Sequence, residues 1–109
     1  MNELLLNVKK YVEPDEQILS FVVGIYEKDN FFFSYQQGIF VATNRRILFY
    51  VEFGYYPAIF EEYSYLHIDE IDMYPHLVFA HKNETVGAKH IQTGNVKKFV
   101  HAIRANLNN

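Results

Sequence analysis

Cysteine and tryptophan are both missing from this chain of 109 residues, which also has only three prolines and five glycines. Without cysteine the chain can form no disulfide, no thiol redox centre, no iron–sulfur cluster and no cysteine-ligated zinc site. An excess of basic residues is missing too, since 10 lysines and arginines stand against 13 acidic residues and the net charge is −3. This balance argues against a broad nucleic-acid footprint, and we expect no nucleic-acid partner.

Long apolar runs are also missing. No stretch approaches the ~20 apolar residues that a membrane-spanning helix needs. Near the start of the chain, the acidic Glu3 precedes the short apolar run Leu4–Leu6, whereas a signal peptide has basic residues before a longer apolar segment. We therefore expect a cytoplasmic protein. Its length predicts a single domain over residues 1–109.

Phenylalanine and tyrosine are abundant. The ten Phe and nine Tyr make up 17% of the residues, and half of all residues are hydrophobic. A chain of this size buries roughly two thirds of the surface that its unfolded form exposes. It can therefore hold a core without a disulfide or a metal ion.

Helical periodicity appears near both ends of the chain. The apolar spacing predicts a helix over about 3–12, which Pro14 ends because the residue before a proline is pushed out of the helical region. A clearly amphipathic helix is predicted over about 96–107, with Asn95 as its N-cap. Its apolar face combines Val96, Phe99, Val100, Ile103 and Leu107.

Between the two helices, short apolar segments are bounded by turn-forming residues, which predicts about seven strands. Thr43–Arg46 and Asn83–Glu84 are the predicted hairpin turns, and residues 66–71 fit either a helical turn or the start of a strand. We predict a mainly β (α+β) fold, an antiparallel meander that closes as a barrel or roll. The strands are expected at about 18–26, 38–43, 46–53, 58–64, 71–74, 77–82 and 85–91.

Three segments resemble a known family. Residues 38–49, Gly-Ile-Phe-Val-Ala-Thr-Asn-Arg-Arg-Ile-Leu-Phe, resemble the hairpin of bacterial pleckstrin-homology (PH)-like domains, the YokE-like group. Residues 60–71 and 96–104 resemble further parts of that family, so that the similarity covers about 4–107. It implies a PH-like barrel with a C-terminal capping helix, here with an extra N-terminal helix. It also implies a binding module without catalytic residues.

The phosphoinositide site of eukaryotic PH domains is not carried over to this chain. Such sites use basic residues on the first two strands and the loop between them. The strand predicted over 18–26 has no basic residue, and the next residues offer only Lys28 between Glu27 and Asp29. A polyphosphate head group needs several converging cations, which this segment does not supply.

An aromatic run stands where we expect the first loop or the start of the second strand. Its rings can fill the core, form a protein or self-association patch, or enter a lipid head-group layer. Two tyrosines beyond the break at Gly54 join it as a candidate interaction surface. That surface comprises Phe31, Phe32, Phe33, Tyr35, Tyr55 and Tyr56.

Arg45 and Arg46 at the tip of the predicted hairpin are the best basic pair. They are a candidate contact for an anion or a partner. The alternative is that one of them pairs with a nearby carboxylate while the other is solvated. The short pairs Lys9–Lys10 and Lys97–Lys98 are explained by solubility.

Catalytic and metal-binding patterns are weak. With an Asn83–Glu84 turn, His76 and His90 point to opposite faces of the sheet, and no helix carries a His-x-x-x-His pair. The carboxylates are spread out, and neither a Gly-x-Ser-x-Gly motif nor a phosphate-binding glycine loop occurs. We therefore predict no metal, no cofactor and no enzymatic activity.

The expected function is that of a non-enzymatic binding or assembly module. Protein–protein interaction, including self-association, would use sheet edges and exposed aromatic side chains, because added strands pair through the main chain and need no motif. Peripheral membrane or lipid binding through Phe31–Phe33 is the alternative.

Overall fold

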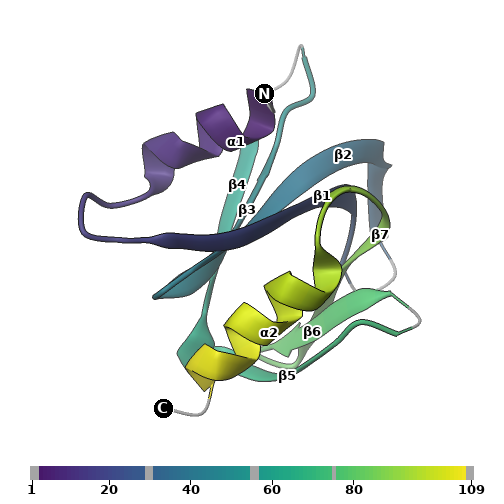
Figure 1. Cartoon of the computed structure of the whole chain (residues 1–109). Helices are drawn as coiled ribbons and strands as arrows, with labels where there is room; N and C mark the ends of the chain where they lie inside the picture. Colours follow the sequence, from purple (N-terminus) through teal and green to yellow (C-terminus); the bar gives the residue numbers. More distant parts are fainter. Residues whose placement is uncertain (1–2, 29–30, 55–56, 75, 108–109) are drawn as a thin grey trace.

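The computed structural model describes residues 3–28, 31–54, 57–74 and 76–107, with the backbone alone at residues 28 and 31–36. Within these ranges, seven antiparallel strands form one sheet in the order β4-β3-β2-β1-β7-β6-β5, which curls into a half-barrel (Figure 1). This confirms the predicted mainly β fold class. The strands are β1 (Ile18–Lys28), β2 (Phe31–Thr43), β3 (Arg46–Val51), β4 (Ile59–Ser64), β5 (Ile68–Asp72), β6 (Leu77–His81) and β7 (Glu84–Gly94).

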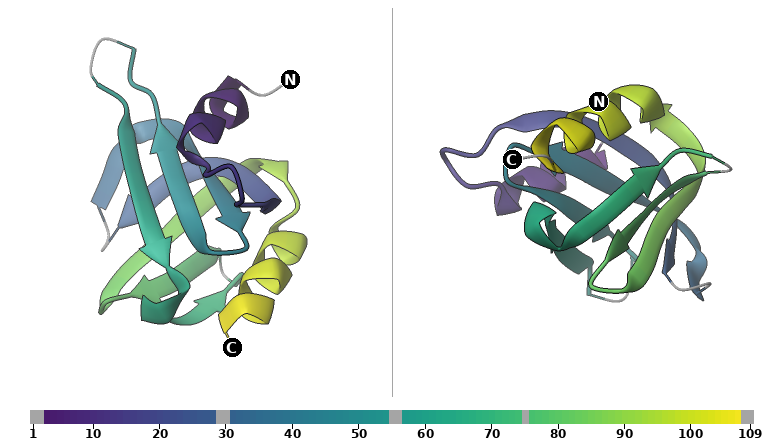
Figure 2. Two further views of the ribbon diagram at one scale, coloured as in Figure 1. Left: turned by 90° about the vertical axis from the view of Figure 1, so that its left-hand side faces the viewer. Right: turned by 90° about the horizontal axis from the view of Figure 1, so that it is seen from below.

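Two α-helices and two short 3-10 helices complete the described chain. They are α1 (Glu3–Val8), η1 (Lys9–Tyr11), η2 (Tyr65–His67) and α2 (Val96–Leu107). α2 lies over the opening of the curled sheet, between β1 and β5, while α1 packs on the outer face of β2 and β3 (Figures 1 and 2). None of the helices in the described ranges is long and apolar enough to cross a membrane.

The two helices cover separate apolar clusters on the two faces of the sheet. The inner cluster lies under α2 and is rich in aromatic rings; those of Tyr26 and Phe49 stack with centroids 4.1 Å apart. The outer cluster lies under α1, where Val8 meets residues such as Ile39 and Leu48. Because side chains alternate along a strand, the β2–β3 hairpin feeds both clusters. This explains why that hairpin reads as a nearly continuous apolar run.

The first two strands are longer than the sequence predicts. β2 begins at Phe31 rather than Gly38, and its backbone pairs with β1 through Glu27↔Phe32 and Lys28↔Phe31. Of the two positions expected for the aromatic run, the start of the second strand is confirmed. β1 also runs two residues beyond the predicted end, to Lys28.

Residues 66–71, which fitted either a helical turn or the start of a strand, contain both. Residues Tyr65–His67 form the 3-10 helix η2, whose N-cap Ser64 accepts from the amide of Leu66, and β5 follows at Ile68. The strand predicted over about 71–74 was therefore placed too late.

The last hairpin turns one residue earlier than predicted. His81 pairs with Glu84, so the turn residues are Lys82 and Asn83, whose φ angles are 49° and 69°. A two-residue hairpin with positive φ at both central positions matches the twist of the strands. Asparagine adopts a positive φ readily, whereas a lysine such as Lys82 gives no indication of one in the sequence. The predicted turn at Asn83–Glu84 was therefore wrong by one residue.

Candidate functional site

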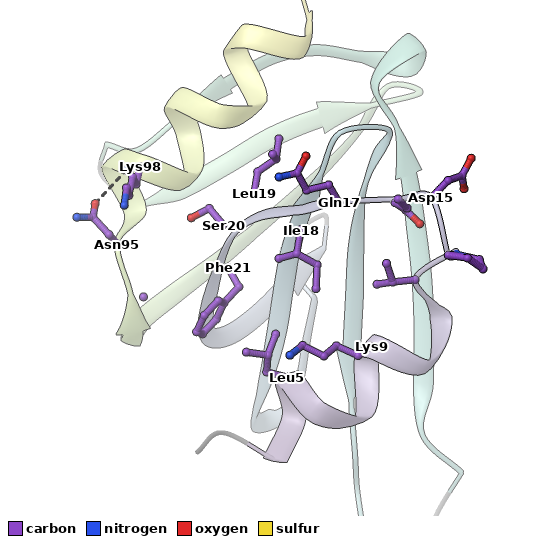
Figure 3. A pocket seen from close by; sticks show the side chains of 14 residues that line it. Leu5, Lys9, Asp15, Gln17, Ile18, Leu19, Ser20, Phe21, Asn95 and Lys98 are labelled. Carbon is purple, nitrogen blue, oxygen red and sulfur yellow. Dashed lines mark hydrogen bonds between the residues drawn. The ribbon is translucent and has the colours of Figure 1, made fainter.

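A groove with a volume of about 930 Å³ lies beside the first residues of β1. The α1–η1 segment forms one side, the start of α2 forms the other, and the connector before β1 closes one end (Figure 3). Its surface is largely apolar, with Leu19 40% exposed. The apolar lining comprises Leu5, Val12, Ile18, Leu19 and Phe21.

A strand edge runs along this groove. In the described chain, residues Ile18–Phe21 have β2 on one side and no strand on the other, because the pairing of β1 with β7 begins only at Val22↔Gly94. A register shift between Ile18 and Ser20 leaves Leu19 as a bulge on this stretch. An edge of this kind presents main-chain donors and acceptors that another chain can pair with.

Gly94 is the reason that β7 stops beside Val22. Its φ is +98°, and a Cβ at this position would lie 2.2 Å from the carbonyl oxygen of Phe21. Asn95 then caps α2, its side-chain oxygen accepting from the amide of Lys98 at 3.0 Å, as predicted for the N-cap. The chain therefore turns from β7 into α2 and leaves the start of β1 uncovered.

A buried ion pair fixes the connector at the end of the groove. The carboxylate of Glu16, whose side chain is fully buried, accepts from Arg46 Nη2 at 2.9 Å and Nε at 3.0 Å, and from Thr43 Oγ1 at 2.6 Å. The bonds from Arg46 outweigh the effect of burial and lower the pKa of Glu16 to about 2. The same contact raises the pKa of Arg46.

The two arginines predicted as an anion or partner contact therefore differ. Arg46 also bonds Glu62 at 2.7 Å and the carbonyl oxygen of Tyr11 at 2.9 Å, and its side chain is only 17% exposed. Arg45 is more exposed and pairs with Asp15. Both guanidinium groups thus have carboxylate partners within the chain.

The charges along the groove leave two unopposed cations. Asp15 and Glu16 line the groove but are paired with the two arginines. Lys9 and Lys98 line it from opposite walls, η1 and α2 (Figure 3). Neither lysine makes an ion pair with any residue that the structure describes. The groove is therefore apolar along the strand edge and positive at its sides.

The predicted aromatic surface falls largely beyond what the structure describes. Phe31, Phe32, Phe33 and Tyr35 lie on β2, but their side chains are outside the description. Tyr55 and Tyr56 lie outside the described residues altogether. Among the described large apolar side chains, those most exposed away from the groove are Leu66 and Tyr74, at 89% and 82%.

A polar cluster in the interior could suggest chemistry, but burial keeps its two tyrosines protonated. Tyr26 and Tyr63 lie 3.0 Å apart through their hydroxyls, and both bond Glu61. Burial raises the pKa of each tyrosine, most strongly that of Tyr63. Both rings pack against Phe49 or Phe79, so the cluster belongs to the inner core.

Two histidines border one groove. His76 and His90 both line a second groove of about 390 Å³ beside α2, and His90 has a φ of 53°. That their side chains point to opposite faces of the sheet stays a prediction. No group of three or more metal-ligating side chains occurs among the described residues.

Sequence reasoning missed the groove. Its lining residues are spread from Leu5 to Lys98, and no pattern in the sequence shows that they converge. The only available signal was the presence of lysine pairs on both helices. One member of each pair, Lys9 and Lys98, lines the groove, whereas Lys10 and Lys97 do not.

Comparisons with known proteins give a single finding. A family model described as bacterial PH domain matches residues 12–105, which is most of the chain. No curated protein and no solved structure matches. The match includes the seven strands and most of α2 but begins after α1.

Proposed function

This chain belongs to the bacterial PH domain family, and from that membership we propose that it is a module that binds another protein in the groove beside β1. Domains of this family act in general as binding modules rather than as catalysts. We assign no reaction to the polar cluster of the inner core, where burial raises the pKa of both tyrosines. The proposal therefore concerns recognition alone.

The observation that carries the proposal is the combination of an apolar groove with a strand edge at Ile18–Phe21. A protein segment offers apolar side chains for the groove and main-chain groups for the edge. A lipid chain offers only apolar groups for the groove. It would bury the main-chain donors and acceptors of the edge without hydrogen-bond partners, which costs free energy. These requirements favour a protein occupant.

Self-association and membrane contact stay predictions that rest on the sequence. The aromatic residues that both would use, Phe31–Phe33 above all, have side chains outside the description, and self-association would also use sheet edges. Light scattering of the purified chain tests self-association, and co-sedimentation with vesicles of anionic and neutral lipids tests membrane contact. A cytoplasmic location is likewise a prediction, which fractionation of host cells tests.

Photo-crosslinking from within the groove tests the proposal. The full chain is produced in its native host with p-benzoylphenylalanine at Leu19, and in a control with the same group at Leu66, which is exposed and outside the groove. We expect one protein to cross-link from Leu19 and not from Leu66, and the same protein, once purified, to bind the unmodified chain stoichiometrically in calorimetry. Identical cross-linking patterns from both positions, or none from Leu19, would overturn the proposal.

A further inference from the structure

The side chains and main-chain groups that line the groove indicate which kind of protein segment it binds. This inference rests on the function proposed above. We infer that its occupant is an extended acidic–apolar peptide segment, which pairs its main chain with the Ile18–Phe21 edge and sets carboxylates against Lys9 and Lys98. The inference follows from the edge, the lining, the charges and the flanking helices.

The strand edge selects an extended main chain. Residues Ile18–Phe21 pair with β2 alone among the described strands, and their outer side borders the groove. Four residues of strand span about 13 Å, so a segment of about four residues can pair along this edge. A helix has its main-chain groups bonded internally and cannot offer them to the edge.

The lining selects apolar side chains on that segment. On the α1 side, Leu5, Ile18 and Phe21 are only partly buried, and they pack at the margin of the outer cluster. Leu19 is displaced by the bulge and is 40% exposed. Because neighbouring side chains of an extended peptide point to opposite sides, some of them would meet this surface and others the α2 side.

The charges select acidic residues. The two carboxylates of the groove, Asp15 and Glu16, are held by Arg45 and Arg46. Lys9 and Lys98 have no such partner among the described residues, and they stand on opposite walls (Figure 3). Acidic side chains on an incoming segment would therefore meet unopposed positive charge, although the chain as a whole carries −3.

The flanking helices disfavour a second copy of the sheet. α1 lies on the outer face of the sheet and α2 on its opposite side, so the edge at Ile18–Phe21 lies in a groove between them (Figure 3). This placement favours a narrow chain over a whole sheet edge from another copy, because such an edge carries its own neighbouring elements towards the two helices.

Peptide selection with a charge-matched control tests the inference. A displayed library of random heptapeptides is selected on the full wild-type chain, and the most enriched peptide is synthesised with a fluorescein label. Its affinity is then measured by fluorescence anisotropy for wild type, for the Lys9→Glu/Lys98→Glu variant and for the Lys10→Glu/Lys97→Glu variant. The two variants change the same charges on the same two helical segments, but only the first changes the groove.

We expect enriched peptides that combine apolar residues with Asp or Glu. Lys9→Glu/Lys98→Glu should weaken binding at least about tenfold, and Lys10→Glu/Lys97→Glu less than about threefold. A second measurement tests main-chain pairing by changing the probe peptide and leaving the protein unmodified. N-methylation of alternate peptide bonds in the probe should weaken binding about tenfold or more at the positions that pair with β1.

Each opposite result overturns the inference. Equal weakening by the two double variants would show that the charges act over the whole surface rather than in the groove. Full affinity of every N-methylated probe would show that no strand is added. If a partner cross-links from Leu19 while these peptide tests fail, the proposed function stands and only this inference falls; if no partner cross-links there, the proposed function falls as well.

Discussion

Arg45 and Arg46 show how far neighbouring residues of the same type can differ. Arg46 is held between Glu16, Glu62 and the carbonyl oxygen of Tyr11, with 17% of its side chain exposed. Arg45 makes a single pair with Asp15 at the surface. The sequence analysis treated them as one basic pair, because their partners lie 16 to 35 positions away along the chain.

Replacing each arginine by leucine should separate the two roles. Arg46→Leu leaves the Glu16 carboxylate buried without its cation and should lower the free energy of unfolding by about 3 kcal/mol. Arg45→Leu removes an exposed pair and should cost less than about 1 kcal/mol. Urea denaturation at neutral pH measures both. Equal losses of stability in the two variants would contradict a special role for the buried ion pair of Arg46 and Glu16.

Acid should weaken the protein through Glu16. Its pKa is about 2 in the folded chain, against an ordinary value of 4.5. A lowered carboxyl pKa stabilises the fold fully above pH 4.5, and this stability is lost as the pH falls towards 2. The shift corresponds to about 3 kcal/mol.

Urea unfolding at a series of pH values measures this loss. Glu16→Gln, which keeps the shape of the side chain, should be less stable than wild type at neutral pH. It should also lose less stability than wild type on acidification. A variant that follows the wild-type acid profile would show that other carboxylates govern it.

At the scale of elements, the junction between β7 and α2 decides whether the groove exists. Gly94 ends β7 with a φ of +98°, and the chain then enters α2 at Val96. If β7 continued alongside β1, it would pair with Phe21 and the residues before it. The open edge is thus a consequence of where one strand stops.

Two glycine substitutions isolate this junction. Gly94→Ala would place a Cβ 2.2 Å from the carbonyl oxygen of Phe21 in a left-handed conformation, and should cost about 3 kcal/mol or more. Gly54 also has a positive φ, of 78°, but no atom lies within 4 Å of a Cβ built there. Gly54→Ala should therefore cost only about 1 kcal/mol. Thermal and urea unfolding compare the two, and similar costs would refute a special role for the crowded junction.

At the scale of the whole molecule, the chain consists of a family core with an added helix. The inner cluster includes residues of α2 but none of α1. α1 precedes residue 12, where the family match begins, and contributes to the outer cluster mainly through Val8, which is fully buried. We therefore expect the strands and α2 to fold without α1, whose packing adds stability of its own.

Deletion of residues 1–8 tests this separation. The strands and α2 should remain folded, because the inner cluster is unchanged, while stability falls by about 2–3 kcal/mol with the loss of Val8 and its neighbours. The uncovered outer face should bind a hydrophobic dye, since Ile39, Val41 and Leu48 lie beneath α1. Two-dimensional NMR spectra report on the fold. A spectrum typical of an unfolded chain would show that α1 is part of the folding core.

The sequence by itself determined the fold class, the helix over residues 96–107 and the hairpin around Thr43–Arg46. These features follow from local sequence patterns. Hydrophobic periodicity reflects which face of a segment is buried, and turn residues reflect the backbone conformation that they favour. Only the tertiary structure decided the partners of Arg46, the groove that His76 and His90 both line, and the groove between Lys9 and Lys98. Those depend on register, on left-handed turns at Lys82, Asn83 and Gly94, and on the curl of the sheet. Such properties bring distant residues together without leaving a local pattern.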